Sequence, residues 1–299
     1  MSRRRELPEG AGALDERDVA ILVALVEHKL LTTEHIHTLF FNSARRAQTK
    51  VQELRELAFI NTLNARARGR RPDRHHLTEL GAQVATFHLG RARSELRVPT
   101  TEAEARVRLP HRLGVNDFFC RLVLVCDASG CGVQAWEDEH KVRAGGREVQ
   151  PDGFGRLLHP GGAVEFLLEY DRGTEHFWAV VRKLGNYLAV SSARPADSPE
   201  QFPNVLFVVP GRGREELLRR AFAVAVERWD PSTARSARMP FYVSHRRALG
   251  ESGHLGPVWL PLAAPARWLR ITELEGTPEC FWDLSECLRV RWIQGAWEG

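Results

Sequence analysis

The run VEFLLEYD at residues 164–171 limits the fold more than any other stretch, because it is apolar yet carries acids at every second or fourth position. Successive side chains of a β-strand point to opposite faces, so one face carries three carboxylates: Glu165, Glu169 and Asp171. Carboxylates this close repel one another unless something positive lies among them. The run therefore predicts a strand with a cation site, or else an edge strand whose acids face solvent.

The pattern around this strand is mixed α/β from Pro110 onward. The apolar spacing predicts helices and strands in the following order: a helix at 112–127, strands at 132–139, 149–158 and 164–171, a helix at 175–190, a strand at 204–209, a helix at 214–228 and a strand at 241–245. The order α-β-β-β-α-β is typical of a restriction-endonuclease-like core. A helix after the acidic strand would cover one of its faces, which favours a site over a solvated edge.

Acids stand where such a core builds its metal site on neighbouring strands. Glu139 ends the first strand, Asp152 follows Pro151 in the second, and the third carries Glu169 and Asp171. We expect a metal site made of Asp152, Glu169 and Asp171, with Glu139 as a further catalytic acid. Mg²⁺ or Mn²⁺ suits such oxygen ligands and leaves positions for water and phosphate. The ion would polarise the scissile phosphate and lower the pKa of an attacking water.

Two resemblances follow from these motifs. Pro151-Asp152, followed by Glu169-x-Asp171, resembles the PD-(D/E)xK nuclease superfamily. A longer series resembles the replication-relaxation family of mobile elements: LGVND (113–117), WEDE (136–139), PDGF (151–154), LEYDRGTE (168–175) and KLGNY (183–187). That resemblance covers roughly residues 15 to 260. It implies a winged helix in front of a nuclease-like domain and a role in plasmid replication and DNA relaxation.

The chain departs from the superfamily at one position. The usual lysine, two residues after the acid, is replaced by Asp171. Lys183 on the following helix is the first candidate to supply the cation that stabilises charge on the phosphate, and Arg172 is the second. Tyr187, one helical turn after Lys183, is expected to pack against the core. If neither cation reaches the site, catalysis is lost while DNA binding survives.

The first ninety residues predict three short helices followed by two strands. Asp15 caps the first helix, Thr32 or Thr33 the second, and Ser43 begins the third. Strands at 59–64 and 74–78 flank the loop ARARGRRPD, which completes a winged helix-turn-helix. Between Ser43 and His76 there are nine Lys or Arg against three Asp or Glu. This local excess predicts a surface for a polyanion, although a charge run can also be only a solvated face.

In a winged helix the third helix enters the major groove and the wing meets phosphate or a minor groove. The expected DNA-binding residues lie on that helix and on the hairpin: Ser43, Arg45, Arg46, Gln48, Thr49, Lys50, Gln52, Arg66, Arg68, Arg70, Arg71 and Arg74. Phosphate contacts carry affinity more than sequence information, so these residues do not predict the DNA site. Double-stranded DNA of a plasmid or mobile-element origin is the expected partner.

The sequence thus predicts a disordered basic tail at 1–14, a winged helix at 15–95, a nuclease-like domain at 107–262 and an appendage at 263–299. The opening MSRRRELPEGAG lacks the apolar segment of a secretory signal, and no run could span a bilayer, so a cytoplasmic protein without a membrane partner is expected. Five cysteines without a CxxC pair argue against a disulfide framework or a zinc ribbon. A homodimer is left open.

Two functions from different classes remain. The first is a metal-dependent DNA endonuclease or nickase, brought to its site by the winged helix. The second is a non-catalytic DNA-binding replication accessory or regulator that uses a degenerate nuclease fold as a scaffold. The missing lysine after Glu169 motivates the second function.

Overall fold

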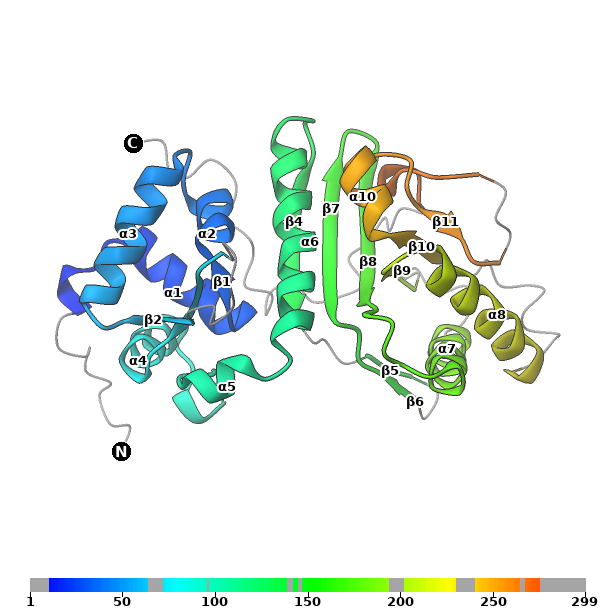
Figure 1. Ribbon diagram of the computed structural model, residues 1–299, viewed down its shortest axis with the longest axis horizontal. Helices are drawn as coiled ribbons and strands as arrows, with labels where there is room; N and C mark the ends of the chain where they lie inside the picture. The colour runs from blue at the N-terminus through cyan, green and yellow to red at the C-terminus, as the bar shows by residue number, and fades with distance from the viewer. Residues whose placement is uncertain are drawn as a thin grey trace. The chain divides into compact units, whose positions relative to one another are not determined.

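The computed structural model describes residues 11–63, 72–95, 97–138, 142–144, 147–193, 202–229, 240–263 and 267–274 (Figure 1). The chain divides into two compact units, one reaching Cys120 and the other beginning at Arg121. This division falls inside helix α6 (Leu109–Asp127), and the predicted domain limits at 95 and 107 lie before it. Among the described helices, none is long and apolar enough to cross a membrane.

Three helices open the first unit, as predicted. They are α1 (Glu16–His28), α2 (Thr33–Phe40) and α3 (Ala44–Glu56). Asp15 caps α1 by accepting a hydrogen bond from the Asp18 amide, and Thr32 caps α2 by accepting one from the His35 amide. Both caps are reciprocal capping boxes, which satisfy amide groups that the first helical turn leaves without partners. Ser43 precedes α3 but makes no side-chain cap.

A three-stranded antiparallel sheet accompanies these helices. Its order is β1-β3-β2, with β1 at Leu31–Thr32, β2 at Ile60–Leu63 and β3 at Arg74–Leu77. Strands β2 and β3 confirm the predicted pair, whereas the two-residue β1 was not predicted. The loop between β2 and β3 lies largely outside the described residues, which resume at 72.

Four short elements of this unit were not predicted. They are η1 (Ala11–Ala13), α4 (Glu79–His88), η2 (Arg93–Glu95) and α5 (Glu102–Arg106). The 3-10 turn η1 lies inside the segment expected to be disordered up to residue 14; residues 1–10 of that tail lie outside the described residues. Thr78 caps α4 and also donates a hydrogen bond to the Ala58 carbonyl, which fixes the start of α4 against the turn between α3 and β2.

Helix α6 is tied to the first unit by one buried amide. Asn116 is fully buried, and its Nδ2 donates to the carbonyl oxygens of His28, at 3.3 Å, and Leu30, at 2.5 Å. These carbonyls belong to the last residue of α1 and to the second residue after it, on either side of Lys29, which adopts a left-handed backbone conformation. The Asn of the LGVND motif therefore has a structural role.

The second unit is built on a six-stranded mixed sheet of order β11-β10-β9-β8-β7-β4 (Figure 1). The strands have these bounds: β4 Gly132–Asp138, β7 Gly153–His159, β8 Gly162–Tyr170, β9 Asn204–Val209, β10 Phe241–His245 and β11 Leu260–Pro261. Strands β4, β7 and β8 are antiparallel neighbours, β8, β9 and β10 run parallel, and β11 returns antiparallel. A separate hairpin joins β5 (Val142–Ala144) to β6 (Arg147–Val149).

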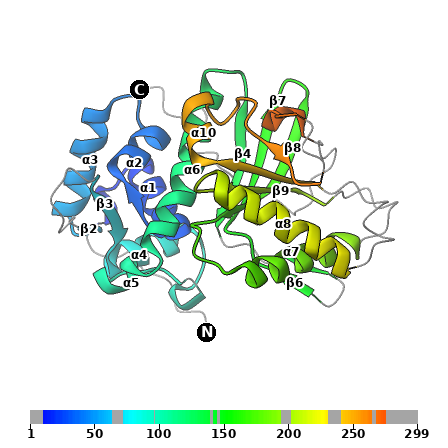
Figure 2. The same cartoon turned by 45° about the vertical axis from the view of Figure 1, so that its right-hand side comes forward.

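Two long helices lie side by side on one face of this sheet (Figure 2). They are α7 (Phe177–Ser192) and α8 (Arg212–Trp229), and the short α10 (Arg246–Ser252) and η3 (Ile271–Glu273) follow later in the chain. A shared core joins Leu184 and Leu188 of α7 to Leu167 of β8 and Phe207 of β9. Residues of β8 on Leu167's face therefore point toward α7 and α8.

The mixed α/β class predicted from the sequence is confirmed, as are the long helices and the strands in their predicted order. One strand was predicted with the wrong bounds. The stretch 149–158 is not continuous, because β6 ends at Val149 and β7 begins at Gly153, with Pro151 and Asp152 in the break. Pro151 has no N–H to offer a ladder, which is a physical reason for the break.

Candidate active site

Glu169 is the centre of the site, near the end of β8. Its side chain lies on the face that α7 covers and is 3% exposed. Tyr187 donates its hydroxyl proton to Glu169 Oε1 at 2.6 Å, and Lys183 Nζ lies 3.0 Å from Oε2. Both partners come from one face of α7, because residues four apart in a helix are neighbours on its surface. The carboxylate is thus held at both oxygens.

Lys183 connects this carboxylate to a second one. Its Nζ also lies 3.1 Å from Glu175 Oε2, in the turn between β8 and α7. These three side chains and Tyr187 line a pocket of about 210 Å³, together with Glu148, Gln150 and Arg182. Lys183 is one-third exposed, so the ammonium group is open to this pocket. It is a cation that a ligand can reach, between the buried Glu169 carboxylate and the partly exposed Glu175 carboxylate.

Asp152 is fixed beside Glu169 by the backbone of β8. Its amide donates to the Leu168 carbonyl at 2.9 Å, and its Oδ2 accepts from the Tyr170 amide at 2.8 Å. Because the chain is not in a strand between β6 and β7, the Tyr170 amide of β8 bonds the side chain of Asp152 and not a backbone carbonyl of a neighbouring strand. The negative charge of Asp152 is close enough to raise the pKa of Glu169. Asp152, Glu169 and Lys183 therefore form one electrostatic cluster.

Burial dominates the electrostatics of the cluster. It raises the pKa of Glu169 from 4.5 to about 7, while Lys183 and the Tyr187 hydroxyl act in the opposite direction. The pKa of Lys183 is raised, because the carboxylates of Glu169 and Glu175 outweigh its own desolvation. The pKa of Tyr187 is also raised, first by burial and then by Glu169. At neutral pH the site therefore holds a charged ammonium, a protonated phenol and a carboxyl near its midpoint.

Asp171 does not join this cluster. Its Oδ2 lies 2.6 Å from Arg214 Nε in the first turns of α8, and its Oδ1 accepts from the Gly173 amide at 2.6 Å. The two charged side chains are 8% and 9% exposed. Arg214 also donates to the Glu175 carbonyl at 2.8 Å, so it closes the turn that leads from β8 into α7. The structure gives Asp171 an ion pair that holds this turn to α8.

Glu165 also has its own cation. It is fully buried, and its Oε1 lies 2.5 Å from Arg156 Nη1 on β7, the residue directly opposite it in the ladder. The three acids of the β8 face are thus neutralised separately, by Arg156, by Lys183 and by Arg214. Three basic side chains supply the positive charge that the acidic strand requires.

A divalent ion fits only part of the predicted ligand set. Within the described residues, no three His, Cys, Asp or Glu side chains come together to hold a metal ion. Mg²⁺, however, is commonly held by one or two carboxylates, with waters and substrate phosphate completing its coordination. Asp152 and Glu169 offer two neighbouring carboxylates of that chemistry, whereas Asp171 is paired with Arg214 of α8 and does not join them.

The other residues predicted for the site lie in different places. Glu139 lies outside the described residues, one position beyond the end of β4. Arg172, the second candidate cation, is exposed in the turn after β8, and no hydrogen bond or ion pair joins it to a described residue. Tyr187 was expected only to pack; it is buried but also bonds Glu169. The position of Tyr187 one helical turn after Lys183 could have indicated its bond to Glu169. Nothing near Arg214 in the sequence indicated that it would pair with Asp171.

The residues expected to meet DNA fall into three groups. On α3, five side chains are exposed: Arg45, Arg46, Gln48, Thr49 and Gln52, while Ser43 before it is half-buried. Lys50 is instead held by ion pairs, since its Nζ lies 3.1 Å from Asp18 and 2.9 Å from Glu53. Arg74 on β3 is 8% exposed, which does not suit a phosphate contact. The wing residues Arg66, Arg68, Arg70 and Arg71 lie outside the described residues.

Comparisons with known proteins place the chain in a family. A structure of the restriction endonuclease FokI bound to DNA aligns at 13% identity with a TM-score of 0.28, too low to define a shared fold. The alignment covers 79% of this chain and 44% of that one. No curated protein matches the chain. The family model for replication-relaxation proteins matches residues 22–205, more than half of the sequence, and this range includes Glu165, Glu169 and Asp171. The chain belongs to the replication-relaxation family.

Proposed function

We propose that this protein is a metal-dependent DNA endonuclease or nickase that acts in the replication, relaxation or mobilisation of a plasmid or other mobile element. The observation that carries the proposal is the cluster of Asp152, Glu169 and Lys183 at the edge of an open pocket. It is the acid, acid and lysine set of a restriction-endonuclease-like core, with the lysine moved from the strand to α7. Family membership supports the setting in mobile-element replication.

Each side chain of the cluster has a distinct task in this proposal. Asp152 and Glu169 would hold Mg²⁺ or Mn²⁺, which would polarise the phosphate and lower the pKa of a water. Lys183 places a positive charge beside the phosphate, where charge grows during attack. Tyr187 is a positioning residue, because its hydrogen bond fixes Glu169 Oε1 and leaves Oε2 toward Lys183 and the pocket. Asp171 is assigned to the fold and not to the metal.

We further propose that the three helices and the antiparallel sheet of the first unit form a winged helix that binds double-stranded DNA. The exposed polar face of α3 supports this, because its Arg45, Arg46, Gln48 and Thr49 side chains are open to a groove. Arg66, Arg68, Arg70 and Arg71 in the loop after β2 would meet phosphate. Lys50 and Arg74 are left out of the interface on the grounds of their ion pairs and burial.

Incubation with supercoiled plasmids that carry candidate origins tests the nuclease. We expect relaxed or linear product with Mg²⁺ or Mn²⁺, none with EDTA, and none from Asp152→Ala or Glu169→Gln. Absence of product across several origins argues against the enzyme. Full activity in Asp152→Ala would show that the product comes from a contaminant.

Salt dependence tests the winged helix. Replacing Arg68, Arg70 and Arg71 with alanine should weaken binding to all duplexes and flatten the log–log salt slope by up to about 3 units. Lys50→Gln is the contrast, since its internal ion pairs predict an unchanged slope. Gln48→Ala or Thr49→Ala should instead reduce discrimination between sequences, because base edges carry the code. An unchanged slope in the triple variant would refute the wing assignment.

A second function is favoured by one observation: Glu165, Glu169 and Asp171 are already paired with basic side chains. On this alternative the protein is a non-catalytic DNA-binding replication accessory or regulator. Calorimetry with Mn²⁺ separates the two functions. Binding that Asp152→Asn abolishes supports the enzyme, whereas no binding, with or without DNA, supports the accessory protein.

A further inference from the structure

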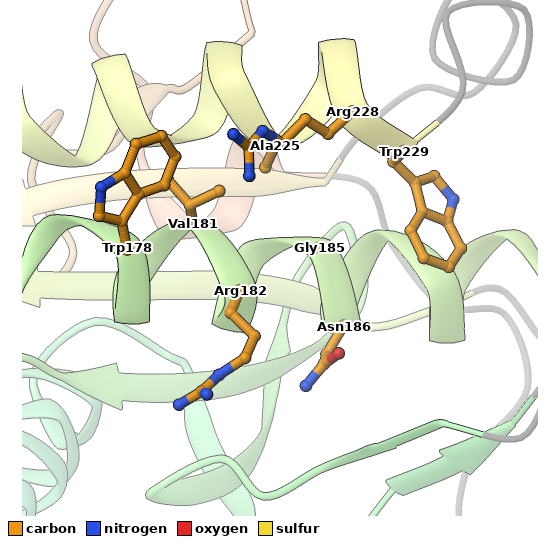
Figure 3. A pocket seen from close by; sticks show the side chains of 8 residues that line it. All are labelled: Trp178, Val181, Arg182, Gly185, Asn186, Ala225, Arg228 and Trp229. Atoms are coloured by element: carbon orange, nitrogen blue, oxygen red, sulfur yellow. The ribbon is translucent and has the colours of Figure 1, made fainter.

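A groove of about 440 Å³ lies on the outer side of α7 and α8 (Figure 3). Two tryptophans stand at its ends, Trp178 from the first turn of α7 and Trp229 from the end of α8. Gly185 and Ala225 contribute to its lining, which leaves space between the helices at these positions. We call this the Trp178/Trp229 groove.

The aromatic ring at one end of the groove is unusually open. Trp178 is 57% exposed, although indole is one of the largest apolar side chains. The guanidinium of Arg228 lies over the Trp178 ring, 4.6 Å from its centroid, a cation–π contact that occupies one face of the indole. An exposed indole with an arginine beside it is a platform on which another flat ring can stack.

The groove is also positively charged. Arg182 and Arg228 are both exposed, and neither forms a hydrogen bond or ion pair with any residue in the described ranges. Asn186 adds an amide that can both donate and accept. Stacking surface, two cations and an amide together suit a ligand that is aromatic, anionic and polar at its edge. A nucleotide has all three properties.

The position of the groove indicates which nucleotide of a bound DNA strand would enter it. Arg182 and Asn186 line both this groove and the pocket that contains Glu169 and Lys183. A DNA strand with a phosphate at Lys183 can therefore pass Arg182 and place a neighbouring base in the groove. Bases inside a duplex are stacked on their neighbours, so only an unpaired or splayed base can enter.

We propose that the Trp178/Trp229 groove binds the base of an unpaired nucleotide next to the phosphate at the Glu169 pocket. Trp178 stacks on the base, Arg182 contacts the phosphate between the two sites, and Asn186 meets the polar edge of the base. This inference deepens the proposed function and rests on it for the phosphate position. It assigns the protein a preference for DNA that is melted or single-stranded beside the cleavage point.

The test measures binding of the full chain to fluorescent oligodeoxythymidylate by anisotropy, in EDTA so that no cleavage occurs. Stacking of one base contributes about 1–3 kcal/mol, so Trp178→Ala should weaken binding about 10-fold. Arg182→Ala should weaken it as well and reduce its salt dependence. Trp268→Ala and Arg247→Ala, both exposed and outside α7 and α8, are the matched controls and should bind as the parent does.

A second oligonucleotide isolates the base. A deoxyribose-phosphate chain of equal length without bases keeps the charge, so the parent and Trp178→Ala should bind it equally. Equal binding of oligothymidylate by Trp178→Ala and Trp268→Ala would overturn the groove assignment. So would self-association of the parent that Trp178→Ala abolishes while DNA binding stays intact, because the groove would then be a protein interface.

The outcomes for the groove and for the nuclease are separable. If the Glu169 pocket is inactive, plasmid stays uncut while the Trp178→Ala effect on oligothymidylate remains. If the groove is wrong, plasmid is cut while Trp178→Ala and Trp268→Ala bind oligothymidylate alike.

Discussion

Replacing Asp171 with asparagine separates a structural acid from the catalytic ones. The substitution keeps the shape and leaves an oxygen for the Gly173 amide, but it removes the charge that faces Arg214. Arg214 is 9% exposed, so its guanidinium would lose its carboxylate in a place that water reaches poorly. Losing one partner of a buried pair costs about 3–5 kcal/mol. Arg214 keeps its bond to the Glu175 carbonyl, which places the cost near the lower value.

We therefore expect Asp171→Asn to lower the free energy of unfolding by about 3 kcal/mol. For a unit of this size each kcal/mol shifts the midpoint by roughly 2–4 °C, so Tm should fall by about 6–12 °C. Denaturant titration and calorimetry measure these quantities. Mn²⁺ affinity, measured well below the lowered midpoint, should match that of the parent.

A double-mutant cycle with Arg214→Leu isolates the pair. The double variant should be more stable than the sum of the single effects predicts, because neither charge is then left alone. The reasoning is refuted if Asp171→Asn loses Mn²⁺ affinity at unchanged stability. That result would make Asp171 a metal ligand and its ion pair with Arg214 dispensable.

Three other outcomes are expected from single substitutions. Tyr187→Phe removes a buried 2.6 Å hydrogen bond to a carboxylate, so it should lower the free energy of unfolding by about 1.5–3 kcal/mol in denaturant titrations. It should also raise the pKa of Glu169 further, and an unchanged pKa would contradict the positioning role of Tyr187. The raised pKa of Glu169 means that the fold favours its protonated form, so the parent should lose about 3 kcal/mol of stability between about pH 4.5 and 7. Glu169→Gln should not show that loss. If the stability of both proteins fell in parallel as the pH rose, Glu169 would not be the source of the loss. Asn116→Ala leaves the His28 and Leu30 carbonyls without this donor and should destabilise the first unit by about 1–3 kcal/mol, as hydrogen exchange in α1 would report.

The sequence determined the local structure because local structure depends on neighbours in the chain. The 3.6-residue apolar period and the capping side chains Asp15 and Thr32 placed the first helices to within a residue or two. The two-residue period of VEFLLEYD placed Glu165, Glu169 and Asp171 on one face of the strand. The break was missed, although Pro151 and Gly153 are both residues that interrupt a strand.

Only the tertiary structure decided which positive group meets each of these acids. Arg156 reaches Glu165 through the register of β7 on β8, Lys183 reaches Glu169 because α7 packs on that face, and Arg214 arrives from a helix 43 residues along the chain. A sequence pattern places a side chain on a face, but the partner depends on how separate elements pack. Three acids that look alike in the sequence are therefore a cross-strand pair, a candidate catalytic carboxyl and a turn-closing ion pair.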